Sequence, residues 1–247
     1  MDLSARRRLE YVAERFDTVE LNGPFYSLQR PSSYASWFDQ TPEGFTFAVK
    51  GGRYITHFKR LVGVETALAN FFASGPLVLR EKLGPFLWQL PAQLTFDPDT
   101  MKAFLDRLPV TSTEAASLAR GHNRHEDQVD TAAHGKRRLR HAIEVRHRSY
   151  VDDAFFSLLA EREMACVVSD APSWPLIDEQ TTDFVYVRLH GHSKLYTSGY
   201  SSKSLDSWAE RCRTWAEEGR AVFVYFDNDA HVHAPYDALS LKERLAP

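Results

Sequence analysis

Residues 142–146 place a carboxylate and a guanidinium in strict alternation with apolar side chains. Ile143 and Val145 are β-branched, and Glu144 and Arg146 alternate with them. Alternate side chains of an extended strand face opposite sides, so one face of this segment is apolar and the other carries both charges. A carboxylate can transfer protons and a guanidinium can hold an anion, which makes the charged face a candidate site.

The same pattern recurs at the C-terminal ends of six other segments. If the β-branched faces pack against helices, the opposite faces carry polar groups, and barrel enzymes place their sites at that end of their strands. So many charges at one edge predict a polar pocket for a small ligand. The side chains in this set are Glu20, Asn22, Lys50, Gln89, Glu144, Arg146, Asp170, Arg188, His190 and Asp227.

Acid–base chemistry on a small polar substrate, anionic or sugar-like, is the function that these residue types favour. Acids and histidines would transfer protons, while cations, amides and a tyrosine would hold the substrate. The reaction, isomerase-like or hydrolase-like, stays open. The predicted catalytic residues are Glu20, His57, Glu144, Asp170, His190 and Asp227, and the predicted substrate-binding residues are Asn22, Tyr26, Lys50, Arg53, Gln89, Arg146, Arg188 and Asn228.

A divalent metal ion is one cofactor that the acids could hold, through Glu144, Asp170, His190 and Asp227. The neighbouring arginines would repel a cation, so a metal is not favoured, no metal ligand is assigned and the cofactor stays unknown. Three further histidines lie between residues 121 and 138, and their spacing fits no metal site. These are His122, His125 and His134.

Three alternatives to an enzyme remain. The charges nearly cancel, so they could form a buried ion-pair network that only stabilises the fold. The protein could instead bind an anionic ligand or nucleic acid without turnover, with bases or sugars stacking on aromatic side chains. A missing first strand could also have abolished function. The candidate stacking residues are Phe25, Tyr26, Trp174, Tyr196 and Tyr200.

The composition narrows the class of protein further. The chain has 247 residues, 43% of them hydrophobic, and a net charge of −3. It offers no overall basic field for nucleic acid, no apolar run that would cross a membrane and no signal peptide. Cys166 falls in an apolar strand and Cys212 in an amphipathic helix, so both are predicted to be reduced core residues. We expect a cytoplasmic protein; its oligomeric state stays open.

Alternation of strands and helices sets the fold class. Strands are predicted at 18–22, 45–50, 86–90, 142–146, 165–170, 184–190 and 221–227. Helices are predicted after Ser4 (apolar at Leu9, Val12, Ala13 and Phe16), at 31–37, 65–73, 97–108, 111–120, after Asp152 or Asp153, at 205–217 and at about 236–245. A glycine-led loop is expected over 51–57, and an exposed, mobile insertion at about 121–138.

These elements predict an α/β protein with a TIM (β/α) barrel fold in a single domain over residues 1–247. Seven strands are visible where a barrel needs eight, and the chain opens on a helix, so the first strand is predicted to be missing or atypical. The chain has no Gly-x-Gly-x-x-Gly sequence after a strand and no Walker A motif. A nucleotide-binding doubly wound sheet is therefore less favoured than a barrel.

Several short motifs together resemble one family. They are Val19-Glu20-Leu21-Asn22 followed by Phe25-Tyr26, Phe45 to Lys50 followed by Thr56-His57, Gln89-Leu90-Pro91, Glu144-Val145-Arg146-His147, Tyr186 to Gly191 and Tyr225-Phe226-Asp227-Asn228. The chain from about residue 9 onward is similar to the YecE-like family, domain of unknown function 72. That resemblance implies a TIM barrel, loosely grouped with sugar isomerases, and no established reaction. The Gly-Trp motif that usually opens the family is absent here.

Overall fold

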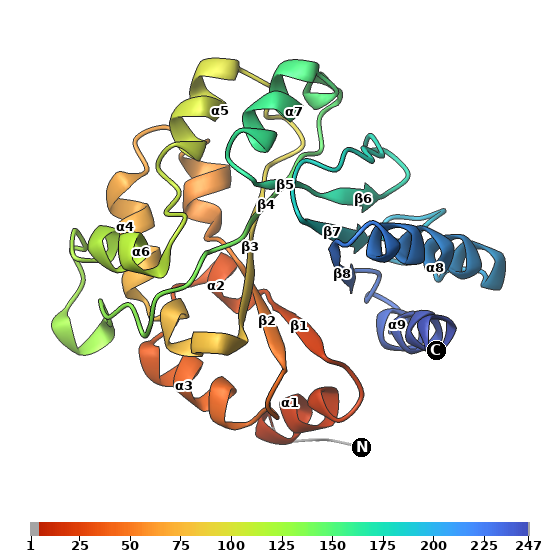
Figure 1. Cartoon of the computed structure of the whole chain (residues 1–247), viewed down its shortest axis with the longest axis horizontal. Coiled ribbons are helices and arrows are strands. Elements are labelled where there is room, and N and C mark those ends of the chain that lie inside the picture. The colour runs from red at the N-terminus through yellow and green to blue at the C-terminus, as the bar shows by residue number, and fades with distance from the viewer. Residues whose placement is uncertain (1–4, 247) are drawn as a thin grey trace. The chain divides into compact units, whose positions relative to one another are not determined.

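The computed structural model describes residues 5–246, in two compact units (Figure 1). The first unit comprises the chain up to Pro91 together with Asp97–His141, and the second comprises Ala92–Phe96 and the chain from Ala142 onward. The predicted Ser4 cap lies outside the described residues. The single domain over residues 1–247 stays a prediction.

Three parallel strands organise the first unit. The strands β1 (Thr18–Leu21), β2 (Thr46–Lys50) and β3 (Leu83–Gln89) are neighbours in that order, and Thr18 pairs with Thr46. Strand β3 begins three residues before the prediction, because Gly84-Pro85 resembles a turn in the sequence but is extended here. The helical elements are α1 (Ala5–Ala13), α2 (Gly23–Tyr26), α3 (Pro31–Asp39), η1 (Tyr54–Phe58), α4 (Glu65–Ala73), η2 (Pro76–Lys82), α5 (Pro98–Leu105), α6 (Ser112–Ala119) and η3 (Glu126–Gln128).

The second unit also contains parallel strands. Strand β4 (His141–Glu144) pairs with β5 (Ala165–Cys166), and β6 (Val168–Asp170), β7 (Phe184–Leu189) and β8 (Ala221–Phe226) form a three-stranded sheet. The helical elements are η4 (Arg148–Tyr150), α7 (Asp153–Ala160), α8 (Ser202–Glu217) and α9 (Ala234–Leu245). Figure 1 shows α8 and α9, in blue, beside β8. The α/β class with parallel sheets is thereby confirmed, whereas no closed ring of strands occurs among residues 5–246.

Apolar side chains at the predicted helical spacing bury one face of α8. Leu205, Trp208, Cys212 and Trp215 pack with Val187 and other side chains of the β6–β8 sheet. Both cysteines of the chain are buried and free of disulfides, and both lie in the second unit. Burial raises the pKa of the Cys166 thiol to about 12 and that of Cys212 to about 11, so both are protonated at neutral pH.

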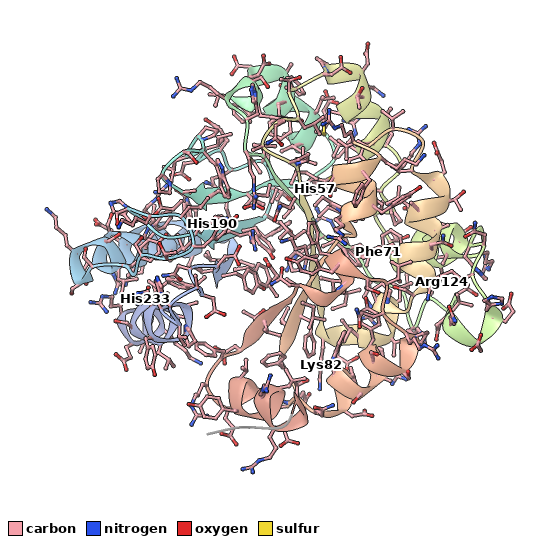
Figure 2. The ribbon with its side chains drawn as sticks, turned by 180° about the vertical axis from the view of Figure 1, so that it is seen from behind. His57, Phe71, Lys82, Arg124, His190 and His233 are labelled. Carbon is pink, nitrogen blue, oxygen red and sulfur yellow. The ribbon has the colours of Figure 1, made fainter. Side chains whose placement is uncertain are left out.

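An aromatic cluster fills the core of the first unit. The ring of Phe71 on α4 lies 5.8 Å from Phe86 and 5.4 Å from Trp88, and Trp88 lies 5.6 Å from Phe104 (Figure 2). A histidine completes this core, because the Trp88 indole donates to His141 Nδ1 at 3.1 Å. His141 Nε2 lies 2.8 Å from the Pro109 carbonyl oxygen, so the neutral Nε2–H tautomer satisfies both contacts.

Gly51 allows β2 to end against this core. A Cβ atom at residue 51 would lie 2.3 Å from Cε3 of Trp88, whereas one at Gly52 would meet nothing nearer than 3.8 Å. We expect Gly51→Ala to lower the free energy of unfolding by about 1–3 kcal/mol, because Trp88 is fully buried and must shift. Urea unfolding measures this, with Gly52→Ala as the control; equal effects of the two would contradict the close approach.

The helix caps predicted within the described residues are present in the structure, whereas one predicted loop differs from it. Asp97 accepts from the Thr100 amide at 2.8 Å and Asp152 accepts from Ala154 at 2.8 Å, as their positions predict. The loop predicted over 51–57 instead contains the helical turn η1. The irregular segment 121–138 hydrogen-bonds to α4 through Asn70 and Asn123, whose side chains are 2.8 Å apart. Its mobility stays a prediction.

Candidate functional site

Glu144 is the centre of a buried polar network in the second unit. The β4 strand ends at this residue, and its side chain is fully buried. Its Oε1 accepts from Ser169 Oγ at 3.2 Å and lies 2.7 Å from His190 Nε2. Its Oε2 accepts from Arg188 at 3.1 Å and from Arg146 at 3.4 Å. Both carboxylate oxygens are therefore occupied by donors from four positions.

Arg188 and His190 both connect Glu144 to Asp227. They lie two residues apart at the end of β7 and just after it, so the alternation of a strand turns both to the same side. Arg188 Nη2 donates to Asp227 Oδ2 at 3.1 Å. His190 Nδ1 lies 3.2 Å from the same oxygen, although the angle is too poor for a hydrogen bond. The side chain of Asp227 is 34% exposed and that of Arg146 11%, so Asp227 is the more open of the two to solvent.

The charges fix the ionisation of Glu144. Burial alone would raise its pKa, but Arg188, Arg146 and His190 hold the pKa well below its usual range. Two carboxylates, Glu144 and Asp227, face two guanidinium groups, Arg146 and Arg188. The carboxylate and guanidinium charges therefore balance, which is the condition for burying so many charges.

Strand register separates Asp170 from this network. Ser169 pairs with Arg188 and Asp170 with Leu189, so Ser169 faces Glu144 while Asp170 lies on the opposite side of the sheet. Asp170 Oδ2 is 3.6 Å from His192 Nδ1, and it is buried with no hydrogen-bond partner among the described residues. The structure thus brings Glu144, Arg146, Arg188, His190 and Asp227 together, and Asp170 joins them only through backbone and loop contacts.

Aromatic side chains cover His190. Its ring lies 4.8 Å from Trp174 and 5.7 Å from Tyr196, both edge-on. The guanidinium carbon of Arg146 lies 3.9 Å from the centre of the Trp174 ring. Arg146 Nε is buried and has no hydrogen-bond partner within the described part of the chain.

A cavity of about 440 Å³ opens beside this aromatic cover. Its volume lies within the range of small-molecule sites. Arg146 of the network and Trp174 of its aromatic cover belong to the cavity wall, and the wall adds two further basic side chains, His147 and Arg148. The complete lining is Ala92, Arg146, His147, Arg148, Pro172, Ser173, Trp174 and Pro175.

A second polar group forms at the strand ends of the first unit. Lys50 is buried with its ammonium group 4.4 Å from the centre of the Phe25 ring. His57, which η1 positions after β2, contacts Phe25 edge-on at 5.2 Å and hydrogen-bonds Thr56 at 2.9 Å (Figure 2). Gln89 Nε2 lies 3.5 Å from His57 Nε2. Lys50, His57 and Gln89 are therefore brought together as a group.

The remaining predicted residues have separate surroundings. Glu20 is half-buried in β1 opposite Ala48, and Asn22 is exposed immediately before α2. Tyr26 is 63% exposed, with the guanidinium of Arg53 5.6 Å from its ring centre. Asn228 donates to the Ser198 carbonyl at 3.0 Å and to Asp237 at 2.8 Å, which anchors the loop after β7.

Ser169, His147 and Arg148 are among the residues of the network and cavity that the predicted set lacks. The alternation of 165–170 puts Ser169 and Asp170 on opposite faces without saying which face meets the network, and the pairing of Ser169 with Arg188 decides it. His147 and Arg148 follow Arg146 in a loop, where no periodicity signals direction. As for a metal, no group of three or more His, Cys, Asp or Glu side chains that could hold an ion occurs in the described part of the chain.

The fold and the network define an α/β protein with parallel sheets and a buried acid–base cluster at strand ends. A family model described as "Protein of unknown function DUF72" matches residues 1–247. The chain belongs to this family, as its motifs predict.

Curated relatives carry names without a function. The UPF0759 protein YecE of Escherichia coli K12 is 35% identical over 105 residues, which is 41% of this chain. That match spans 37% of the length of the E. coli protein. The UPF0759 protein YunF of Bacillus subtilis is 23% identical over 98% of this chain and 88% of its own.

Two solved structures share the fold. A DUF72 family protein from Thermotoga maritima has a TM-score of 0.76 at 23% identity, covering 98% of this chain and 90% of its own. A DUF72 family protein from Enterococcus faecalis has a TM-score of 0.74 at 20% identity, covering 97% and 93%. None of the helices that the structure describes has the length and apolar character that crossing a membrane requires.

Proposed function

We propose that the protein is an acid–base enzyme that acts on a small anionic, sugar-like substrate at the strand ends of the second unit. The single observation that carries this proposal is the position of His190 between Glu144 and Asp227, at 2.7 and 3.2 Å. A histidine whose Nε2 is held by one carboxylate while its Nδ1 faces a second carboxylate has a restricted orientation, and it can accept or release a proton without reorganising its surroundings.

The roles within the network follow from exposure and occupancy. Glu144 is fully buried, ionised and saturated with donors, so it positions His190 and Arg188 rather than taking protons from a substrate. Asp227 is partly exposed and shares its Oδ2 with Arg188 and His190. The His190–Asp227 pair is thus the unit that would exchange protons with a substrate.

The cavity wall supports an anionic substrate. Arg146 and Arg148 would bind a phosphate or carboxylate, and guanidinium groups bind such anions with two parallel hydrogen bonds. Trp174 presents an aromatic face that a sugar ring could contact.

The finer fold and location assignments belong to the same proposal. Parallel strands that alternate with helices support a TIM (β/α) barrel, the architecture in which strand ends carry the site. An experimental structure tests the closure of the barrel. A cytoplasmic location is proposed from the two buried, protonated cysteines and is tested by cell fractionation.

Ligand binding and proton exchange test the function separately. We expect at least one member of a panel of sugar phosphates and sugar acids to bind, measured by calorimetry. We expect Arg148→Ala to weaken that binding about tenfold or more, because it removes a charge-assisted contact. Arg213→Ala, an exposed position on α8, is the control. Equal binding by the Arg148 and Arg213 variants, or no binding by any compound, contradicts the proposal.

Proton transfer is followed with the compound that binds. In D₂O we expect the wild-type protein to exchange a carbon-bound hydrogen of that compound for deuterium, detected by NMR. His190→Gln keeps a polar side chain but cannot shuttle a proton, so exchange should slow about 100-fold or more. Exchange at the wild-type rate in this variant would exclude His190 as the acid or base.

A further inference from the structure

The loop after β2 exposes an unusual set of aromatic side chains. Tyr54 and Phe58 of η1 are 55% and 68% exposed, and Tyr26 of α2, in the same unit, is 63% exposed. The ring centres of Tyr54 and Phe58 lie 6.4 Å apart. Large aromatic groups on a surface usually serve an interaction, because exposing them to water is unfavourable.

Basic side chains are interleaved with these rings. Between Glu43 and Glu65 the sequence contains no acidic residue, although the whole chain has a net charge of −3. Arg53, Lys59 and Arg60 are all exposed in this stretch. The guanidinium of Arg53 lies 5.6 Å from the ring centre of Tyr26 and 5.8 Å from that of Phe58. The surface therefore offers flat stacking faces and positive charge within one short segment.

A cavity adjoins the same surface. It has a volume of about 430 Å³, and Tyr54 and Lys59 belong to its wall together with Leu28 and Ile55. Two side-chain amides, those of Asn70 and Asn123, also line it and hydrogen-bond each other at 2.8 Å. Amides of this kind hydrogen-bond the edges of bases that are not paired. The cavity lies in the first unit and shares no lining residue with the cavity of the proposed active site.

We propose that this surface, made of Tyr26, Arg53, Tyr54, Phe58, Lys59 and Arg60, binds single-stranded nucleic acid. Exposed rings stack on unpaired bases, the cations contact phosphates, and the adjoining cavity accepts one unstacked base. Duplex nucleic acid fits less well, because its bases are already stacked. The cations could also bind an anionic membrane surface, but three aromatic rings interleaved with arginine and lysine fit bases better than acyl chains.

Fluorescence anisotropy with the full chain tests this proposal. The probes are labelled single-stranded RNA and DNA of mixed sequence, about 16 nucleotides long, and a duplex of the same sequence. We expect binding at low salt to at least one of the two single strands and weaker binding to the duplex. Tyr54→Ala combined with Phe58→Ala should weaken the single-strand affinity about tenfold or more. Tyr236→Ala on α9, whose ring is 71% exposed, is the matched control.

The salt dependence tests the phosphate contacts. Lys59→Ala combined with Arg60→Ala should make the slope of log affinity against log salt less steep by about 1.4, about 0.7 for each contact. No binding to either single strand, equal affinity for the duplex, or an unchanged affinity in the Tyr54 and Phe58 variant overturns the proposal. So does binding to anionic phospholipid vesicles without binding to oligonucleotides. None of these substitutions touches His190, so failure here is distinct from failure of the proposed enzyme.

Discussion

Replacing Glu144 by Gln is expected to lower the free energy of unfolding by about 3–5 kcal/mol. The substitution keeps the shape of the side chain but removes a full negative charge that contacts Arg146 and Arg188 together with His190. Arg188 is 1% exposed and keeps its contact with Asp227, but the network is left with two guanidinium groups and one carboxylate, and water cannot solvate the excess charge at this depth. Urea unfolding at neutral pH measures the change.

Glu210→Gln provides the control, because Glu210 is exposed on α8 and surface substitutions change stability by about 0.5 kcal/mol or less. A pH series adds an independent check. The folded-state pKa of Glu144 lies below its usual 4.5, so its contribution is present above that pH and is lost as the pH falls further. The variant should lack this loss; an effect of Glu144→Gln no larger than that of the control would show that the network adds nothing.

Acidification from pH 6.5 to about 4 is expected to remove about 3 kcal/mol of stability through His141 alone. Burial lowers the pKa of this histidine from its usual 6.5 to about 4, while the Pro109 carbonyl opposes the shift. Within that window the unfolded chain takes up a proton that the folded chain does not. Acidification therefore stabilises the unfolded state relative to the folded state. The wild-type free energy of unfolding should therefore rise with pH across this range.

His141→Gln should flatten that slope, although its own stability at neutral pH will be lower. His231→Gln is the matched control, because this side chain is exposed. NMR offers a direct reading, since the ring of His141 should keep its neutral Nε2–H form down to about pH 4. A ring that becomes protonated near pH 6.5 would contradict the buried, neutral state.

Elements with a strong period are predictable from this sequence. All seven predicted strands are present, and helix α4 has the predicted bounds 65–73. Their apolar residues repeat at the spacing of a strand or a helix, and that spacing decides which face is buried. For the same reason the polar faces of β4 and β7 correctly placed Glu144, Arg188 and His190 on one side of their strands.

Features that depend on tertiary contacts were not predictable. The segment 165–170 is interrupted at Val167, and only the pairing with β7 reveals that Ser169 rather than Asp170 faces Arg188. Helical turn η1 has no periodic apolar face from which it could be predicted. His141 precedes a predicted strand, but the Trp88 indole and the Pro109 carbonyl that justify its burial come from distant parts of the chain.

The two cysteines give this chain an internal reporter. Both are buried, both lie in the second unit, and they are the only cysteines in the sequence. A thiol-specific alkylating reagent can reach them only when that unit opens. Openings confined to the first unit do not expose either thiol and leave the alkylation rate unchanged. The alkylation rate of the unmodified protein thus measures how often the part that carries His190 opens, without any label being introduced.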